Sequence, residues 1–209
     1  VDIIAEVSKR LSSSKKPFII HKGQEILFDQ VKQSSVSLSK IKKGDVVVLI
    51  GDFDYVTIST LLHLINLKTF IVPLTYETIA DHEYFIKTVG ADFIIDGMKV
   101  TKVFNAKPSL INIMKQKERG GLILFSTGTT GKPKAALHDM DVFLKKFYFP
   151  RPSLRTLNFL LFDHIGGINT LIHTLFNNGI IIVPSARNVS SILSDCYKHK
   201  IELLPTTPT

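Results

Sequence analysis

Short apolar runs alternate along this chain with longer segments whose apolar residues recur at helical spacing. The clearest run, residues 46–50, is apolar at every position, which is typical of a strand buried on both faces of a parallel sheet. It is followed by a helical pattern at 56–64, a strand at 70–72, a helix at 80–89 and a strand at 93–95. This order predicts a β-α-β-α-β arrangement.

The two ends of the chain extend this pattern. The N-terminal part predicts a helix ending near Leu11, a hairpin with strands at 18–20 and 25–28, and a helix from Asp29 to Ser39. The second half predicts strands near 122–125, 157–161, 180–183 and 201–204, with helices between them. The predicted fold class is therefore α/β, with mostly parallel sheets and flanking helices, and ligands are expected beyond the carboxyl ends of the strands. We expect two sub-layers of one body, approximately 1–110 and 111–209.

Composition and charge exclude several classes of protein. With 44% hydrophobic and 21% charged residues, the chain can bury a core, and its net charge of +8 is spread over scattered basic pairs that do not predict a nucleic-acid partner. The most apolar long stretch, 56–74, is interrupted by His63, Asn66 and Lys68, so no membrane span is expected. The single cysteine, Cys196, cannot form an internal disulfide, and no signal peptide is evident at the start, which predicts a cytoplasmic location.

The most informative segment directly follows the apolar run 121–125. It reads Ser126-Thr127-Gly128-Thr129-Thr130-Gly131-Lys132-Pro133-Lys134, and no Asp or Glu occurs from Arg119 to His138. Glycines allow backbone N–H groups to converge, hydroxyls add donors and lysines add positive charge, so the segment predicts a phosphate site. It is not a Walker loop, because Ser126 replaces the first glycine and Pro133 follows Lys132 in place of Ser or Thr.

Over its whole length this segment resembles the phosphate loop of the AMP-forming adenylate ligases, which include acyl- and aryl-CoA synthetases, luciferases and peptide-synthetase adenylation domains. Other parts of the chain are similar to motifs of the same family in the same order: residues 67–74, His138, residues 162–167 and residues 203–209. Ala135 departs from the glycine usual after the last lysine. The family's later motifs and its C-terminal domain with the catalytic Lys would follow Thr209, so we expect 1–209 to be an incomplete N-terminal domain without the C-terminal domain.

The resemblance implies a role for each residue of the loop. Hydroxyl and backbone groups would bind the ATP phosphates, and glycines would permit the turns; these residues are Ser126, Thr127, Gly128, Thr129, Thr130 and Gly131. Lys134 would hold a phosphate and stabilise the departing pyrophosphate, whereas Lys132 is either a second phosphate contact or a solvated neighbour. The implied cofactors are ATP and Mg²⁺, with the Mg²⁺ site incomplete in this chain.

A second segment, Phe162-Asp163-His164-Ile165-Gly166-Gly167, implies a substrate pocket that contains His164, Gly166 and Gly167. The alternative is that His164 is only a hydrogen-bonded rim residue. We do not expect an Asp163–His164 dyad, because neighbours on a strand point to opposite faces. The other histidines lack ligand spacing, so no metal site is expected within the chain.

These observations predict a ligase that condenses a small-molecule carboxylic acid with Mg·ATP to acyl-AMP and pyrophosphate, and then transfers the acyl group to the thiol of CoA or of a carrier protein. An acyl-CoA synthetase type implies a place in fatty acid metabolism. The 209-residue chain alone is expected to be inactive and to require the remainder of its own enzyme. Two alternatives stay open: a peptide-synthetase-type adenylation domain, and a non-catalytic nucleotide- or acid-binding module. The sequence does not determine the acid, the thiol acceptor or the oligomeric state.

Overall fold

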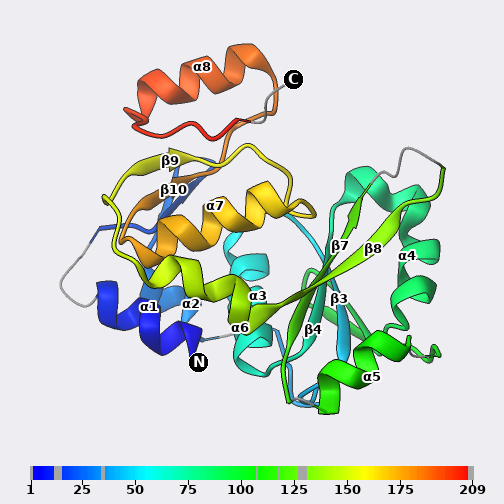
Figure 1. Ribbon diagram of the computed structural model, residues 1–209. Helices are drawn as coiled ribbons and strands as arrows, with labels where there is room; N and C mark the ends of the chain where they lie inside the picture. Colours follow the sequence, from blue (N-terminus) through cyan, green and yellow to red (C-terminus); the bar gives the residue numbers. More distant parts are fainter. Residues whose placement is uncertain are drawn as a thin grey trace.

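In the computed structural model the chain forms two β-sheets with helices around and between them (Figure 1). The structure describes residues 2–11, 16–33, 36–106, 108–116, 118–126 and 131–206. Parallel pairing dominates the centre of each sheet, while three of the four edge strands pair antiparallel and the fourth, β9 (Arg155–Leu157), is a parallel edge strand. The predicted α/β class is therefore confirmed.

The six-stranded sheet is built around the apolar run that the sequence placed in its centre. Its spatial order is β6 (Lys99–Lys102), β5 (Phe93–Asp96), β3 (Val46–Ile50), β4 (Phe70–Leu74), β7 (Gly121–Ser126) and β8 (Lys134–Asp139). Every residue of β3 and β4 is buried, and Val48 lies opposite Val72 in parallel register. Neither face of such a strand is in contact with water, so no polar side chains are needed on it, and this explains the continuous apolar run.

The four-stranded sheet joins the two ends of the chain. Its order is β2 (Gln24–Ile26), β1 (Ile19–His21), β10 (Ile180–Ile182) and β9 (Arg155–Leu157). The predicted N-terminal hairpin is present, and Ile19 of β1 pairs with Ile181 of β10. Each sheet thus contains strands from both sides of residue 110, so the sheets do not follow the division into 1–110 and 111–209. On the edge of β1 that does not face β2, the backbone N–H and C=O groups form hydrogen bonds with β10, although β10 is distant in sequence.

Three predicted elements are shorter in the structure. The predicted helix 29–39 is a single turn, α2 (Phe28–Val31), because the Ser- and Val-rich sequence that follows has low helix propensity. The strand predicted at 157–161 ends at Leu157, where the buried Asn158 side chain donates to the Gly167 carbonyl. The strand predicted at 201–204 is reduced to one bridge between Leu203 and Thr156.

Helices cover both sheets and fill the space between them. The longer ones are α1 (Ile3–Leu11), α3 (Tyr55–Asn66), α4 (His82–Val89), α5 (Ser109–Gln116), α7 (Ile165–Phe176) and α8 (Val189–Lys198). Short helical segments are η1 (Tyr76–Asp81), α6 (Met140–Lys145) and η2 (Lys146–Tyr148). None of the helices within the described ranges is long and apolar enough to cross a membrane.

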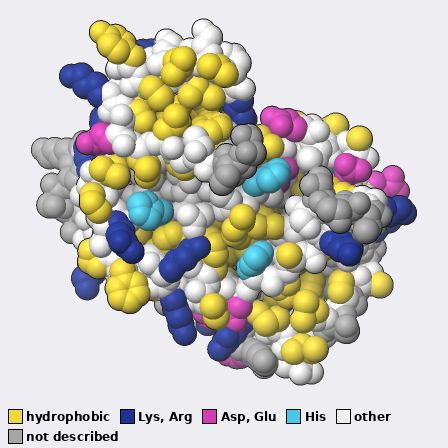
Figure 2. Space-filling model, turned by 45° about the horizontal axis from the view of Figure 1, so that its top comes forward, with side chains coloured by type: hydrophobic (Ala, Val, Ile, Leu, Met, Phe, Trp, Pro, Cys, Tyr) yellow, Lys and Arg dark blue, Asp and Glu magenta, His cyan; other side chains and the backbone are white. Residues whose placement is uncertain are grey.

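The surface carries dispersed positive charge and one apolar lobe. Lys and Arg side chains are scattered over the face shown in Figure 2, where apolar side chains gather on the lobe that carries α8. Val189, Leu193 and Tyr197 recur every fourth residue on the exposed side of α8, and Leu193 is 63% exposed. The same helix packs inward through the neighbouring, partly buried Ile192 and Cys196.

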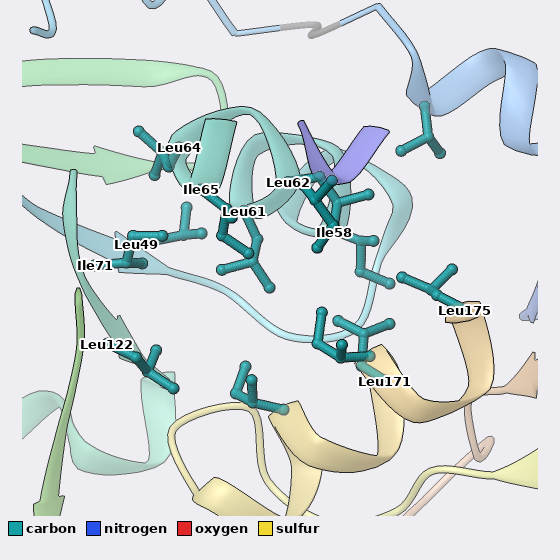
Figure 3. Packing of buried hydrophobic residues seen from close by; sticks show 14 of the residues in the cluster. Leu49, Ile58, Leu61, Leu62, Leu64, Ile65, Ile71, Leu122, Leu171 and Leu175 are labelled. Carbon is teal, nitrogen blue, oxygen red and sulfur yellow. The ribbon is translucent and has the colours of Figure 1, made fainter. Parts of the chain in front are cut away.

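One continuous core connects the two sheets. It contains Ile19 and Ile181 from the four-stranded sheet and Leu49 from the six-stranded sheet. The helices α3 and α7 bring buried leucines together between the sheets, including Leu61 and Leu171 (Figure 3). Because apolar contacts run without interruption from one sheet to the other, the edges of both sheets are held in a fixed relation.

Candidate functional site

A cavity of about 370 Å³ lies beyond the carboxyl ends of β4 and β7, beside the first turn of α7. Its floor is apolar and includes Leu74, Phe85, Phe125 and Ala136; its polar lining includes Ser126, His138, Asp163 and His164. We call this space the histidine cavity. His164 shares this cavity with Ser126 and Pro133, which lie on either side of the undescribed part of the Gly/Thr-rich loop. The reason is not a shared sheet edge, because Ser126 ends β7 of the six-stranded sheet, whereas His164 follows β9 of the four-stranded sheet. The cavity therefore lies between parts of the chain that belong to different sheets.

The loop is held by the β7–β8 hairpin. Ser126 and Lys134 face each other in register at the end of the hairpin that leads into the loop. Gly131 has a φ of 120°, a conformation that favours glycine over other residues. Four predicted phosphate-binding residues, Thr127, Gly128, Thr129 and Thr130, lie outside the described residues. The hairpin therefore fixes both ends of the predicted phosphate loop, while the role of the loop stays a prediction.

The two lysines of the loop differ in their surroundings. The Lys132 Nζ atom lies 5.6 Å from the centre of the Tyr84 ring, and the Tyr84 hydroxyl donates to the Pro133 carbonyl at 3.1 Å. Lys134 is exposed and, by strand alternation, shares its face of β8 with His138. Both lysines line a neighbouring cavity of about 650 Å³ between α4, α5 and the hairpin. Neither has a carboxylate partner among the described residues, so both charges are available to an anion.

Asp163 and His164 form the pair that the sequence analysis rejected. The Asp163 Oδ1 atom lies 2.7 Å from His164 Nδ1, and Oδ2 accepts a hydrogen bond from the Thr75 hydroxyl at 3.0 Å. The rejection was wrong because it assumed a strand. β9 ends at Leu157, and residues 163 and 164 lie in the turn before α7, where neighbouring side chains need not point apart. Asp163 is buried, whereas His164 is largely exposed at the cavity.

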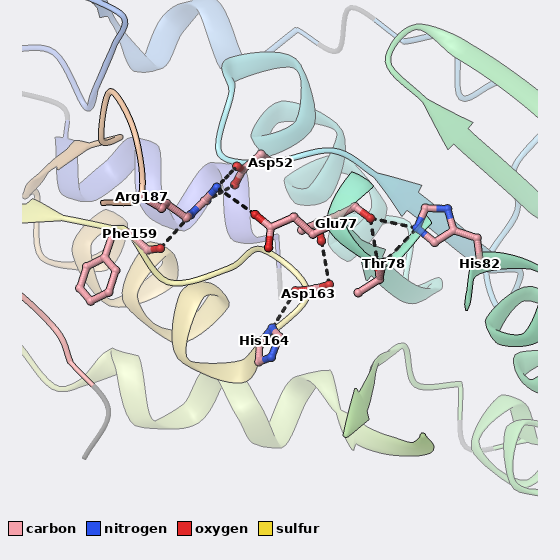
Figure 4. A network of polar contacts seen from close by, with 9 residues as sticks. Asp52, Glu77, Thr78, His82, Phe159, Asp163, His164 and Arg187 are labelled. Atoms are coloured by element: carbon pink, nitrogen blue, oxygen red, sulfur yellow. Dashed lines mark hydrogen bonds and ion pairs between the residues drawn. The ribbon is translucent and has the colours of Figure 1, made fainter. Parts of the chain in front are cut away.

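The network continues through Thr75 into the sheet edge (Figure 4). The Thr75 carbonyl accepts hydrogen bonds from His82 Nε2 at 2.9 Å and from the Thr78 hydroxyl at 3.1 Å. His82 is buried at the start of α4, and Thr75 directly follows β4. Sequence analysis missed both residues, although a hydroxyl placed immediately after a buried strand was a usable signal.

A half-buried ion pair joins the loops that follow β3 and β10, next to the histidine cavity. Arg187 binds Asp52 through both terminal nitrogens, at 2.7 and 2.8 Å, and its Nε atom donates to the Phe159 carbonyl at 2.8 Å. Burial alone would lower the pKa of Arg187, but its hydrogen bond to Asp52 and the nearby carboxylates outweigh burial and raise that pKa. The pair lines a third cavity, of about 500 Å³, and fixes the two sheet edges beside the site. Sequence analysis did not identify it.

The two glycines predicted to line the pocket have different environments. A Cβ atom on Gly167 would lie 2.2 Å from the Leu161 carbonyl oxygen and 2.9 Å from the Phe53 ring. A Cβ atom on Gly166 would meet only the Leu160 side chain, at 2.9 Å from its Cδ1 methyl. Close packing of α7 against backbone therefore requires glycine at position 167, whatever its part in the pocket.

We expect Gly167→Ala to destabilise the protein by about 1–3 kcal/mol, because overpacking against a carbonyl forces the backbone to move. This loss should exceed the gain of about 1 kcal/mol that alanine brings to a helix. Gly166→Ala is the matched control: the Leu160 side chain can rotate away, so stability should change little or increase. Urea unfolding of both variants measures the difference. Equal stabilities would contradict the packing assigned to Gly167.

Among the residues that the structure describes, no group of three or more His, Cys, Asp and Glu side chains could hold a metal ion. The histidine cavity combines hydroxyl, imidazole, carboxylate and apolar groups.

Comparison with known proteins supports the fold. No protein-family model and no curated sequence matches the chain. The Klebsiella oxytoca NpsA N-terminal subdomain in complex with anthranilyl-AMSN matches with a TM-score of 0.75 at 18% identity, over 97% of this chain and 59% of that one. The inhibitor-bound N-terminal domain of FACL13 from Mycobacterium tuberculosis gives 0.74 at 14% identity, over 99% and 63%.

A third solved structure is the o-succinylbenzoate CoA synthetase MenE of Bacillus subtilis with the acyl-adenylate intermediate OSB-AMP. It matches with a TM-score of 0.68 at 16% identity, over 95% of this chain and 60% of that one. The chain thus spans about three fifths of the length of these structures. Its fold is that of the N-terminal domain of adenylate-forming enzymes, as the resemblance implied.

Proposed function

We propose that this chain is the N-terminal part of an AMP-forming carboxylate ligase. In the first step a carboxylate oxygen of the acid bonds to the α-phosphorus of ATP, and the bond to the bridging oxygen breaks to release pyrophosphate. In the second step a thiol sulfur bonds to the acyl carbon, AMP departs and the thiol proton is lost. The observation that carries the proposal is one cavity shared by the end of the Gly/Thr-rich hairpin and by His164.

The cavity supplies what such a reaction needs at its acyl end. Its apolar floor suits the body of an acid. Ser126 and His138 in its lining belong to the hairpin, where the phosphates would bind, and His164 lies at the start of α7. The first turn of α7 adds the positive end of a helix dipole at Ile165. We assign Ser126, Lys134 and the intervening loop to the phosphates, and His164 to the acyl carboxylate. Positioning and charge stabilisation would then account for most of the catalysis.

We favour an acid without an amino group, and therefore the acyl- or aryl-CoA synthetase type over the peptide-synthetase type. An amino acid needs a carboxylate for its ammonium group. Of the two in the lining, Asp163 is already bonded on both oxygens, and Asp81 is exposed, where water screens its charge. A volume of about 370 Å³ suits a compact acid. The thiol partner would be CoA or a carrier arm, in the cytoplasm.

The test is acid-dependent exchange of labelled pyrophosphate into ATP, measured with aryl, fatty and amino acids. We assign the complete activity to a polypeptide of the neighbours' length, of which this chain spans about 60%. The native gene product should catalyse exchange with an apolar acid, and the 209-residue chain alone should not. Pyrophosphate binding without exchange by the native product, for any acid, would instead favour a non-catalytic binding module.

A further inference from the structure

We infer that Asp163 is a positioning residue: it holds His164 in the form protonated on Nδ1, so that Nε2 is the nitrogen left free at the histidine cavity. The consequence for catalysis rests on the proposed function, whereas the assignment of the proton rests on geometry alone. Within the described part of the chain, the imidazole of His164 forms a hydrogen bond with Asp163 and with no other residue.

The position of the proton follows from the chemistry of the partner. An ionised carboxylate only accepts hydrogen bonds, so a neutral imidazole in contact with it must carry its hydrogen on the nitrogen that faces it. The contact from Nδ1 to Asp163 Oδ1 is 2.7 Å, the length of a charge-assisted hydrogen bond. His164 is thereby fixed in one tautomer rather than exchanging between two.

Asp163 is itself held in place from the other side. Its second oxygen accepts the Thr75 hydroxyl at 3.0 Å, and the carboxylate is 7% exposed, so water does not compete for it. The Thr75 backbone is fixed in turn by His82 and Thr78, which donate to its carbonyl. A chain of hydrogen bonds therefore runs from α4 through the end of β4 to the start of α7 (Figure 4).

This arrangement leaves His164 with one ring nitrogen, Nε2, that can exchange a proton or form a hydrogen bond at the cavity. Because Nδ1 is occupied, any proton that His164 gains or releases at the cavity passes through Nε2. In the neutral form Nε2 accepts a hydrogen bond, and after taking up one proton it donates to a carboxylate, while the charge of Asp163 compensates the charge on the ring. His164 can then contact the carboxylate in the first step and the thiol in the second step through Nε2, without a change in ring orientation.

The test is nitrogen NMR of the histidine rings in the 209-residue chain, at a pH high enough that the ring signals no longer change with pH and the ring is neutral. His164→Gln identifies the signals among the seven histidines. The Nδ1-protonated form should exceed the other form by roughly tenfold or more, as expected for a hydrogen bond to a charged group. Predominance of the Nε2-protonated form would overturn the inference.

Two variants separate positioning from a merely structural role. Asp163→Ala removes the acceptor, and the ratio of the two forms should fall by roughly tenfold or more. Asp163→Asn keeps the shape, but its amide can turn either its oxygen or its NH₂ group toward the ring, so the ratio should also fall. This variant decides the test if the alanine variant does not fold.

Asp81→Ala is the control. Asp81 is a carboxylate that lines the same cavity without a hydrogen bond to His164, so its removal should leave the ratio unchanged. An unchanged ratio in folded Asp163 variants would overturn the inference. No ligand is used, so failure of the proposed ligase activity would leave this result intact.

Discussion

Replacement of Lys134 by methionine should weaken binding of pyrophosphate to this chain by about 10- to 100-fold. Lys134 is exposed at the loop end of the β7–β8 hairpin, opposite Ser126, and has no carboxylate partner among the described residues. A charge-assisted hydrogen bond to a phosphate oxygen contributes about 1.5–3 kcal/mol, which corresponds to this loss. Methionine keeps the apolar stem of lysine and removes only the charge. Isothermal titration with pyrophosphate measures the effect.

Lys132→Met is the matched control for Lys134→Met. It removes the same charge two residues earlier, from a side chain that lies over the Tyr84 ring. We expect the affinity for pyrophosphate to fall by less than about threefold, the size of a solvent-screened charge effect. Equal losses in both variants would show that only the overall positive charge matters, which would contradict the role assigned to Lys134.

Leu171→Ala should lower the free energy of unfolding by about 3–5 kcal/mol, the range for a fully buried leucine whose cavity cannot collapse. Leu171 is 0% exposed on α7, and it packs in the core that also contains leucines of α3 and residues of both sheets. Because that core is continuous, the loss should appear in both sheets at once. Denaturant unfolding followed by far-UV circular dichroism, with hydrogen exchange in β1 and in β3, measures it.

Leu193→Ala is the corresponding control on another helix. Leu193 is 63% exposed on α8, so its truncation should change the free energy of unfolding by no more than about 0.5 kcal/mol. Loss of protection in only one sheet of Leu171→Ala would contradict the single core. It would also indicate that the two sheets unfold as separate units.

The four inner strands of the six-stranded sheet were predictable from sequence because they are marked by apolar runs. The edge strands β6 and β8 were not predicted, because they are largely exposed and carry no such run. In β3 and β4 every side chain is buried, so the local pattern already carries the tertiary constraint. The four-stranded sheet was less predictable, since β1 pairs with β10, more than 150 residues away in sequence. Neither strand has a sequence feature that indicates which strand it pairs with. The two sheets therefore do not follow the expected division near residue 110.

The candidate site was predicted in part. Ser126 and His164 carried the resemblance and do share a cavity. Asp163 was misjudged because the strand was extended past Leu157, and this error reversed the expected direction of its side chain. Thr75, His82 and the Arg187–Asp52 pair were missed because their contacts join residues far apart in sequence, or, for His82, because a buried histidine gives no local signal.

The most direct test is a crystal structure of this chain with a non-hydrolysable acyl-adenylate analogue that carries a compact aryl acid. The account predicts the acyl group in the histidine cavity, against Phe85 and Phe125 and within reach of His164 Nε2, with the phosphate mimic at the hairpin between Ser126 and Lys134. Binding of the analogue beside the Arg187–Asp52 pair, with the histidine cavity empty, would contradict it.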